Sequence, residues 1–155
     1  MNSIQEIVKY LKQKGERMSP LYESDVDSIK KECNVKLPGA YKEFLLYMGR
    51  GAGRYMIGSD VFYDKMLHLQ FWAEELAKEN NLQPLPPGSF TFWMHQGYRA
   101  AYFMTGDGED PAVYFYSEEK GIDGFKIMTN SLTDFFLYQL KVSFSEDEFD
   151  LPNIR

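Results

Sequence analysis

Residues 90–127 read FTFWMHQGYRAAYFMTGDGEDPAVYFYSEEKGIDGFKI, and this stretch decides the fold. It contains three runs rich in Phe, Tyr, Trp and Val, over 90–95, 98–105 and 112–117, and a shorter run at 125–128. Aromatic and β-branched side chains favour strands, and the Gly, Asp and Pro residues between the runs favour turns. We therefore expect an antiparallel or mixed, aromatic-rich sheet of about four to six strands, with helices covering one face.

The flanking sequence has the apolar spacing of helices. The strongest of these patterns is LPGAYKEFLLYMG at 37–49, which begins near Pro38 and ends at Gly49. Its inward stripe consists of Tyr41, Phe44, Leu45 and Met48. Further helices are expected over 3–14, 24–33, 67–80 and 132–142. The chain is thus predicted to be an α+β protein, with N-terminal helices and one C-terminal helix covering the sheet.

The sequence also predicts three local details. Ser24 is expected to cap the second helix, because a hydroxyl at that position can accept a backbone N–H. The segment 54–58 is expected to form a short strand, and Trp72 is expected to face inward from the helix at 67–80. The glycine-rich segment 49–53 follows a helix, whereas phosphate-binding loops open one, so it predicts a helix end and a connection.

Length and composition predict one domain over 1–155, which ends in an acidic tail at 145–155. The net charge of −6 and the pI near 5.0 argue against binding to nucleic acid and favour a basic protein partner. The single cysteine, Cys33, excludes a disulfide within the chain and is expected to be a buried apolar residue. The N-terminus has no signal peptide and no apolar run is long enough to span a membrane, so we expect a cytoplasmic protein.

No pattern of catalytic or metal-binding residues stands out. His68 and His95 have no Cys or His neighbour at metal-ligand spacing, and the acidic turn at 107–110 lacks the frame of a calcium loop. We expect no catalytic residue, no metal and no cofactor. A small hydrolase or ligand-binding protein with a pocket near His95 and Arg99 is the remote alternative.

Acidic turns beside aromatic strands instead suggest a surface that binds another protein. The acidic side chains would pair with Lys and Arg of the partner, and tyrosines would anchor the contact. The candidate contact residues are Tyr98, Asp107, Glu109, Asp110, Tyr116, Glu118 and Glu119.

Four segments together resemble the SUKH superfamily, which is named after the yeast Smi/Knr regulators of cell-wall synthesis. The segment at 37–49 looks like its LP-x-x-Y-x-x-FL-x-x-x-x-G signature. The other three are HQGYRAAYF at 95–103, DGEDPAVYFYSEE at 107–119 and SLTDFFLYQL at 131–140. The chain departs from the common pattern at Met48, where many members carry Asn, and in having only Gly97 where many have a glycine-rich turn.

The resemblance covers roughly residues 20–142, which it implies are the core of a single SUKH-like domain. It implies an α+β domain without enzymatic activity. Most bacterial members look like immunity proteins that bind a cognate toxin, often a nuclease, and block it. The resemblance therefore implies a cytoplasmic, toxin-neutralising protein. We expect a monomer or weak homodimer whose partner, a cognate protein toxin, has a basic surface. The alternative it leaves open is a regulatory module that binds another protein of the cell.

Overall fold

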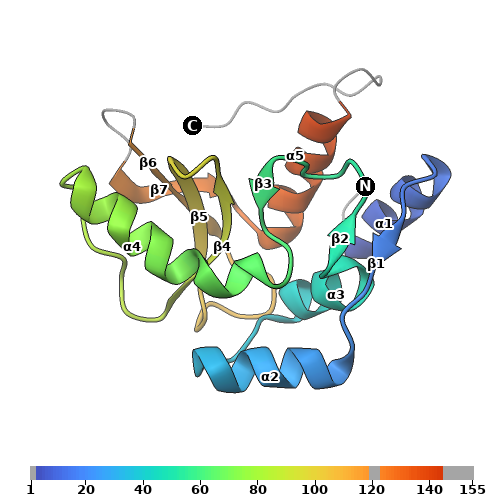
Figure 1. Cartoon of the computed structure of the whole chain (residues 1–155), viewed down its shortest axis with the longest axis horizontal. Coiled ribbons are helices and arrows are strands. Elements are labelled where there is room, and N and C mark those ends of the chain that lie inside the picture. Colours follow the sequence, from blue (N-terminus) through green and yellow to red (C-terminus); the bar gives the residue numbers. More distant parts are fainter. Residues whose placement is uncertain (1–2, 119–122, 145–155) are drawn as a thin grey trace.

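The computed structural model describes residues 3–118 and 123–144, apart from the side chains of 123–125. These described residues form five α-helices, one 3₁₀ helix and two antiparallel sheets (Figure 1). The helices are α1 (Ile4–Gln13), α2 (Glu23–Cys33), α3 (Gly39–Met48), η1 (Lys65–His68), α4 (Leu69–Glu79) and α5 (Leu132–Ser143). The strands are β1 (Met18–Ser19), β2 (Gly51–Ala52), β3 (Ser59–Asp60), β4 (Ser89–His95), β5 (Arg99–Met104), β6 (Val113–Ser117) and β7 (Asp123–Thr129).

The larger sheet contains all four strands expected in the aromatic stretch. Its strand order is β3-β4-β5-β6-β7, with every neighbouring pair antiparallel. The β4–β5 connection turns at Gln96 and Gly97, which both have positive φ, at 53° and 76°. Two successive residues with positive φ form the type of tight hairpin turn whose twist matches that of the flanking strands. The α+β class and the antiparallel sheet predicted from the sequence are therefore confirmed.

Helices cover both faces of this sheet, whereas one covered face was expected. On one face, Phe92 and Phe103 both contact Tyr41 of α3. Phe92 also contacts Phe135 of α5. On the other face, the ring of Tyr102 stacks on that of Tyr114 and lies tilted against that of Tyr116. Helix α4 lies across this face of the sheet in Figure 1. The strands are mostly apolar on both sides, which is the pattern of a sheet buried on both faces.

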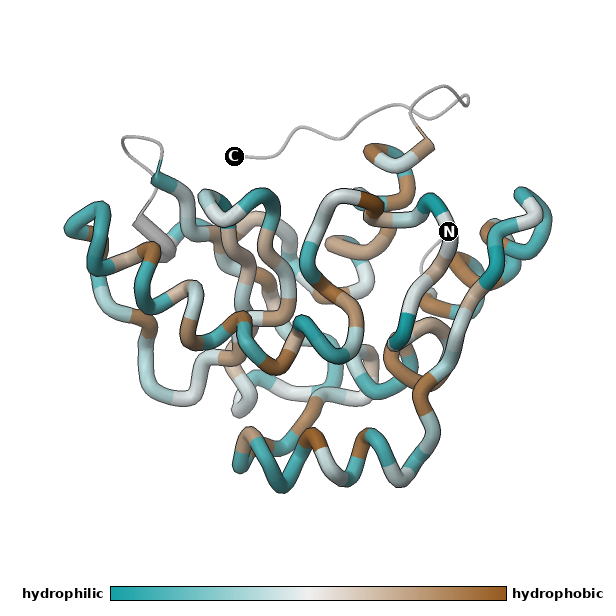
Figure 2. The backbone as a smooth tube through the Cα atoms, viewed as in Figure 1, coloured by the Kyte–Doolittle hydropathy of each residue, from teal (hydrophilic) through white to brown (hydrophobic). Residues whose placement is uncertain are grey.

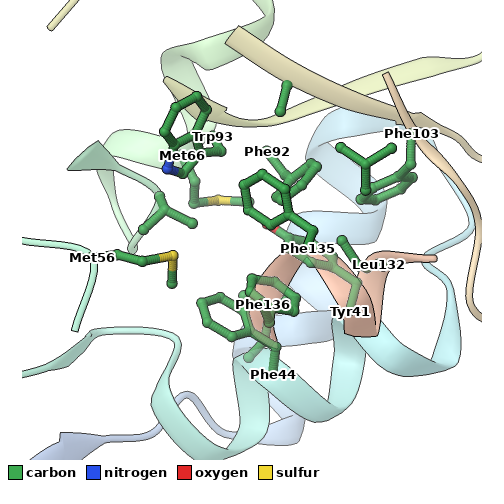
Figure 3. Close-up of a cluster of buried hydrophobic side chains, with 14 of the residues drawn as sticks. Tyr41, Phe44, Met56, Met66, Phe92, Trp93, Phe103, Leu132, Phe135 and Phe136 are labelled. Carbon is green, nitrogen blue, oxygen red and sulfur yellow. The ribbon is translucent and has the colours of Figure 1, made fainter. Parts of the chain in front are cut away.

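The core between the sheet, α3 and α5 is mainly aromatic (Figure 3). The rings of Phe44 and Phe136 stack with their centroids 4.3 Å apart, and Phe92 meets Phe135 edge to face at 4.9 Å. Offset stacks and edge-to-face pairs are the favoured aromatic geometries. The predicted inward stripe of α3 is confirmed, since each of its four residues is at most 1% exposed.

The structure differs from the sequence-based prediction in three local details. The N-cap of α2 is Tyr22 rather than Ser24, and the Asp25 carboxylate accepts its backbone N–H at 2.8 Å. Residues 54–58 form turns rather than a strand, since only Ser59 and Asp60 pair with β4. Trp72 is 37% exposed and does not face inward. Figure 2 shows the hydrophobic positions of α2 turned toward the rest of the molecule, in keeping with buried Val26 and Ile29.

Candidate protein-interaction surface

The candidate contact residues lie at opposite ends of the sheet. Tyr98 and Glu118 are neighbours at one end, where the Glu118 N–H donates to the Tyr98 carbonyl at 3.2 Å. Asp107 follows the far end of β5. The strand between them rises by about 3.3 Å per residue, so the two groups are separated by roughly 20 Å. They therefore form two acidic sites, not one continuous surface.

The acidic turn at 107–110 is tied to the beginnings of two helices. The Asp110 carboxylate accepts the backbone N–H of Thr133 in the first turn of α5 at 2.9 Å. The Glu109 carbonyl accepts the backbone N–H of Ala40 in the first turn of α3, also at 2.9 Å. Backbone N–H groups in the first turn of a helix have no partner within the helix. Asp110 and the Glu109 backbone thus have a structural role, and Asp107 is exposed beside them.

The two candidate tyrosines have different environments. Tyr98 is partly buried, with the Arg99 guanidinium over its ring at 5.2 Å and the His95 ring edge-on at 6.2 Å. Tyr116 is 0% exposed, and its hydroxyl donates to the carbonyl of Gln83. The expectation that Tyr116 is exposed is therefore wrong, because the face of the sheet on which it lies is covered. Glu119 lies outside the described residues.

A second surface, which the sequence analysis missed, lies on the outer face of α4. His68, Phe71, Trp72, Glu75 and Glu79 recur at helical spacing, opposite the buried residues of the same helix. We call these five residues the α4 surface. Phe71 is 63% exposed, and the His68 ring stacks on Trp72 with centroids 5.4 Å apart.

The combination on the α4 surface is the one expected for a protein contact. Large aromatic side chains are enriched among the interface residues whose truncation to alanine costs the most binding energy. Nearby carboxylates steer the approach of a basic partner. A helical pattern of 68, 71, 72, 75 and 79 is visible in the sequence. Trp72 was assigned to the core because helical spacing does not by itself say how wide the buried stripe is.

The groups that could support catalysis form no complete set. Ser59 Oγ and His95 Nδ1 are 3.1 Å apart, but no carboxylate in the described part of the chain bonds the other ring nitrogen of His95. Burial, and then the charge of Glu32, raise the pKa of the Cys33 thiol, which disfavours the reactive thiolate. Cys33 is only partly buried, rather than fully as expected.

The described residues contain neither a cluster of metal ligands nor a membrane-spanning helix. Across 3–118 and 123–144, no three His, Cys, Asp or Glu side chains are close enough to hold a metal ion. Within these ranges, no helix has the length and apolarity needed to cross a membrane.

The family assignment agrees with this geometry. The family model described as SMI1-KNR4 cell-wall, within the SUKH superfamily, matches residues 23–136. The chain belongs to the SUKH superfamily. The matched region runs from the start of α2 into α5 and so includes the whole five-stranded sheet and the α4 surface. SUKH domains are generally non-catalytic immunity or regulatory modules. No curated protein has a significant match to this chain.

Proposed function

We propose that this SUKH protein is a non-enzymatic immunity protein that binds and neutralises a cognate toxin in the bacterial cytoplasm. The observation that supports this best is the α4 surface, where Phe71 and Trp72 are exposed beside Glu75 and Glu79. An exposed aromatic pair is costly in water and favourable in a desolvated contact. The partner should offer an apolar recess for Phe71 and Lys or Arg side chains for the two carboxylates.

The overall charge fits such a partner. The chain carries −6, so a toxin with a basic active surface would be attracted over a distance and held by local pairing. Asp107 and Glu118 are further exposed contact candidates at the two ends of the sheet. Glu109 and Tyr98 remain candidates beside them. Asp110 is a weaker one, because its carboxylate already stabilises the start of α5.

The decisive experiment uses the protein encoded by the gene adjacent to the one that encodes this chain. Its C-terminal domain is produced in cells with and without this chain, and binding is measured by calorimetry. We expect the domain to be toxic alone, rescue by this chain, and a complex that weakens as salt rises. If the neighbour is not toxic, or if this chain does not rescue the cells, the toxin-neutralising role is wrong.

The contact residues are tested in the same assay. Phe71→Ala and Trp72→Ala should each weaken binding by about 2 kcal/mol, or roughly thirtyfold. Tyr47→Ala is the matched control, because Tyr47 is 38% exposed but lies on α3. Asp107→Lys and Glu118→Lys should slow association and reduce its salt dependence. Full affinity in all four variants would remove these surfaces from the site.

The family description favours one second candidate. Because it refers to the cell-wall regulators SMI1-KNR4, a module that binds a cellular regulatory protein is the alternative function. It would use the same exposed α4 surface without a toxin. A chain that fails to rescue, yet loses binding to a cell-envelope synthesis protein on Trp72→Ala, would support this alternative.

A further inference from the structure

A groove of about 480 Å³ lies between α1 and α3. Its volume is in the range of ligand-binding pockets, which is about 300–1,000 Å³. Helix α1 contributes five residues that follow the spacing of one helix face, and α3 contributes one. We call these six residues the α1 groove: Gln5, Val8, Lys9, Lys12, Gln13 and Tyr47.

The α1 groove is basic, although the protein is acidic overall. Lys9 and Lys12 are exposed, and neither ammonium group pairs with a residue in the described part of the chain. None of the described residues that line the groove is acidic. Residues 4–14 contain three lysines and one glutamate, whereas the whole chain carries −6. That glutamate, Glu6, lines a separate cleft beside Lys9 and Tyr10. The two unpaired lysines therefore favour an acidic ligand.

The length of the groove suits a short extended peptide. Gln5 and Gln13 are eight positions apart on α1, which is about 12 Å at 1.5 Å per residue. An extended segment of about four residues covers this distance, at about 3.3 Å per residue. Glutamine amides both donate and accept hydrogen bonds, so Gln5 and Gln13 can bind the backbone of such a segment.

The spacing of the two lysines matches alternate side chains of an extended peptide. Lys9 and Lys12 are neighbours on the helix surface, with Cβ atoms about 5–6 Å apart. Side chains two residues apart in a strand point to the same side and are about 6.6 Å apart. Carboxylates at alternate positions can therefore each reach one lysine. The side chains between them point to the other wall, where Tyr47 is 38% exposed and offers an aromatic contact.

Helix α1 is separate from both the family match and the α4 surface. The family model begins at residue 23, whereas α1 ends at Gln13. The helix still packs against α3 and α5 through its buried apolar stripe. In Figure 1, α1 and α4 lie at opposite ends of the molecule. A ligand in the α1 groove therefore leaves the α4 surface accessible.

We propose that the α1 groove binds a short, extended, acidic segment of another protein, with carboxylates at alternate positions. The carboxylates pair with Lys9 and Lys12, the glutamines hold the peptide backbone, and an apolar side chain packs on Tyr47. An anionic membrane fits less well, because it would repel a chain that carries −6. Binding here does not depend on the toxin-neutralising function proposed above.

Amide NMR spectra of the full chain test this binding with three end-blocked peptides. Gly-Glu-Leu-Glu-Gly has alternate carboxylates, Gly-Glu-Glu-Leu-Gly has adjacent ones, and Gly-Gln-Leu-Gln-Gly has none. We expect the first peptide to shift the signals of α1 and Tyr47, but not those of α4, and to bind about threefold more tightly than the second. Equal binding of the first peptide and either of the others, or no shift in α1, would overturn the proposal.

Substitutions identify the groups that hold the peptide. Lys9→Gln and Lys12→Gln should each weaken binding of Gly-Glu-Leu-Glu-Gly about threefold, and Tyr47→Ala about fivefold. Lys78→Gln is the matched control, because Lys78 is an exposed lysine on α4, outside the groove. Unchanged affinity in all three groove variants would contradict the proposed contacts.

Two further measurements separate this groove from other binding. Sedimentation with vesicles of phosphatidylcholine and phosphatidylserine should be absent. Sedimentation that is lost in Lys9→Gln and Lys12→Gln would instead assign the groove to a membrane and overturn peptide binding. The same two variants should keep full affinity for the toxin domain, since α4 is distant from α1. Failure of the toxin proposal is therefore distinguishable from failure of this one.

Discussion

The carboxylate of Asp110 accepts a hydrogen bond from the backbone N–H of Thr133 at 2.9 Å. This contact joins the turn after β5 to the first turn of α5, where Ser131 Oγ already accepts the N–H of Asp134 at 3.0 Å. The beginning of α5 is thus capped by one local side chain and by one from a distant turn. The acidic turn therefore helps to dock the C-terminal helix.

Asp110→Ala should lower the free energy of unfolding by about 1–2 kcal/mol, because it removes a charged acceptor from a helix N-terminus. Urea denaturation of the purified protein measures this change. Asp107→Ala is the control, because the Asp107 side chain makes no hydrogen bond or ion pair with a described residue. This substitution should change stability by about 0.5 kcal/mol or less. Similar stability of the two variants would show that the Thr133 contact contributes little.

Glu16→Gln should make stability less dependent on acidic pH. The backbone N–H of Arg54 donates to the Glu16 carboxylate at 2.9 Å, and with the Arg54 side chain it lowers the pKa of Glu16 below the ordinary 4.5. A lowered folded pKa gives stability that is present above the unfolded pKa and is lost as pH falls through the folded one.

The wild type should therefore exceed Glu16→Gln by about 1 kcal/mol near neutrality, a modest value because Arg54 is largely exposed. The difference should narrow as the pH falls below the ordinary Glu value of 4.5. Urea unfolding at a series of pH values measures this, with Glu32→Gln as an exposed control. A difference that stays constant down to low pH would contradict the pKa argument.

Gly49→Ala should destabilise the fold by about 1–3 kcal/mol, the usual cost of overpacking. A Cβ at this position would lie 2.6 Å from the Leu45 carbonyl oxygen and 2.7 Å from the Leu21 side chain. That carbonyl also accepts the N–H groups of Leu21 and Gly49. Thermal unfolding measures the loss. Gly106→Ala, with open space around it, should unfold near the wild-type temperature.

Tyr116→Phe should cost about 1 kcal/mol of stability, because the buried hydroxyl donates to the Gln83 carbonyl. Affinity for the protein partner should not change, since the ring is not at the surface. Tyr98→Phe is the companion variant, as the Tyr98 hydroxyl makes no hydrogen bond with a described residue. Weaker partner binding by Tyr116→Phe at unchanged stability would place this tyrosine in the contact after all.

The α+β class, the four main strands and the approximate helix positions could be predicted because they depend on periodicity and turn chemistry within short segments. The stripe of α3 illustrates this, since its apolar spacing names the buried residues directly. Trp72 and Tyr116 were misplaced for a different reason. Both are amphipathic aromatic residues, which suit a core and a surface equally well.

The sequence by itself determined the elements, because local backbone preferences and apolar spacing act over a few residues. Only the tertiary structure decided which surfaces are free. Placing α4 across the second face of the sheet buried Tyr116 and left Phe71 and Trp72 exposed. Docking α5 against the turn at 107–110 gave Asp110 a helix N–H to accept. Both outcomes depend on contacts between residues far apart in the chain, which no local pattern specifies.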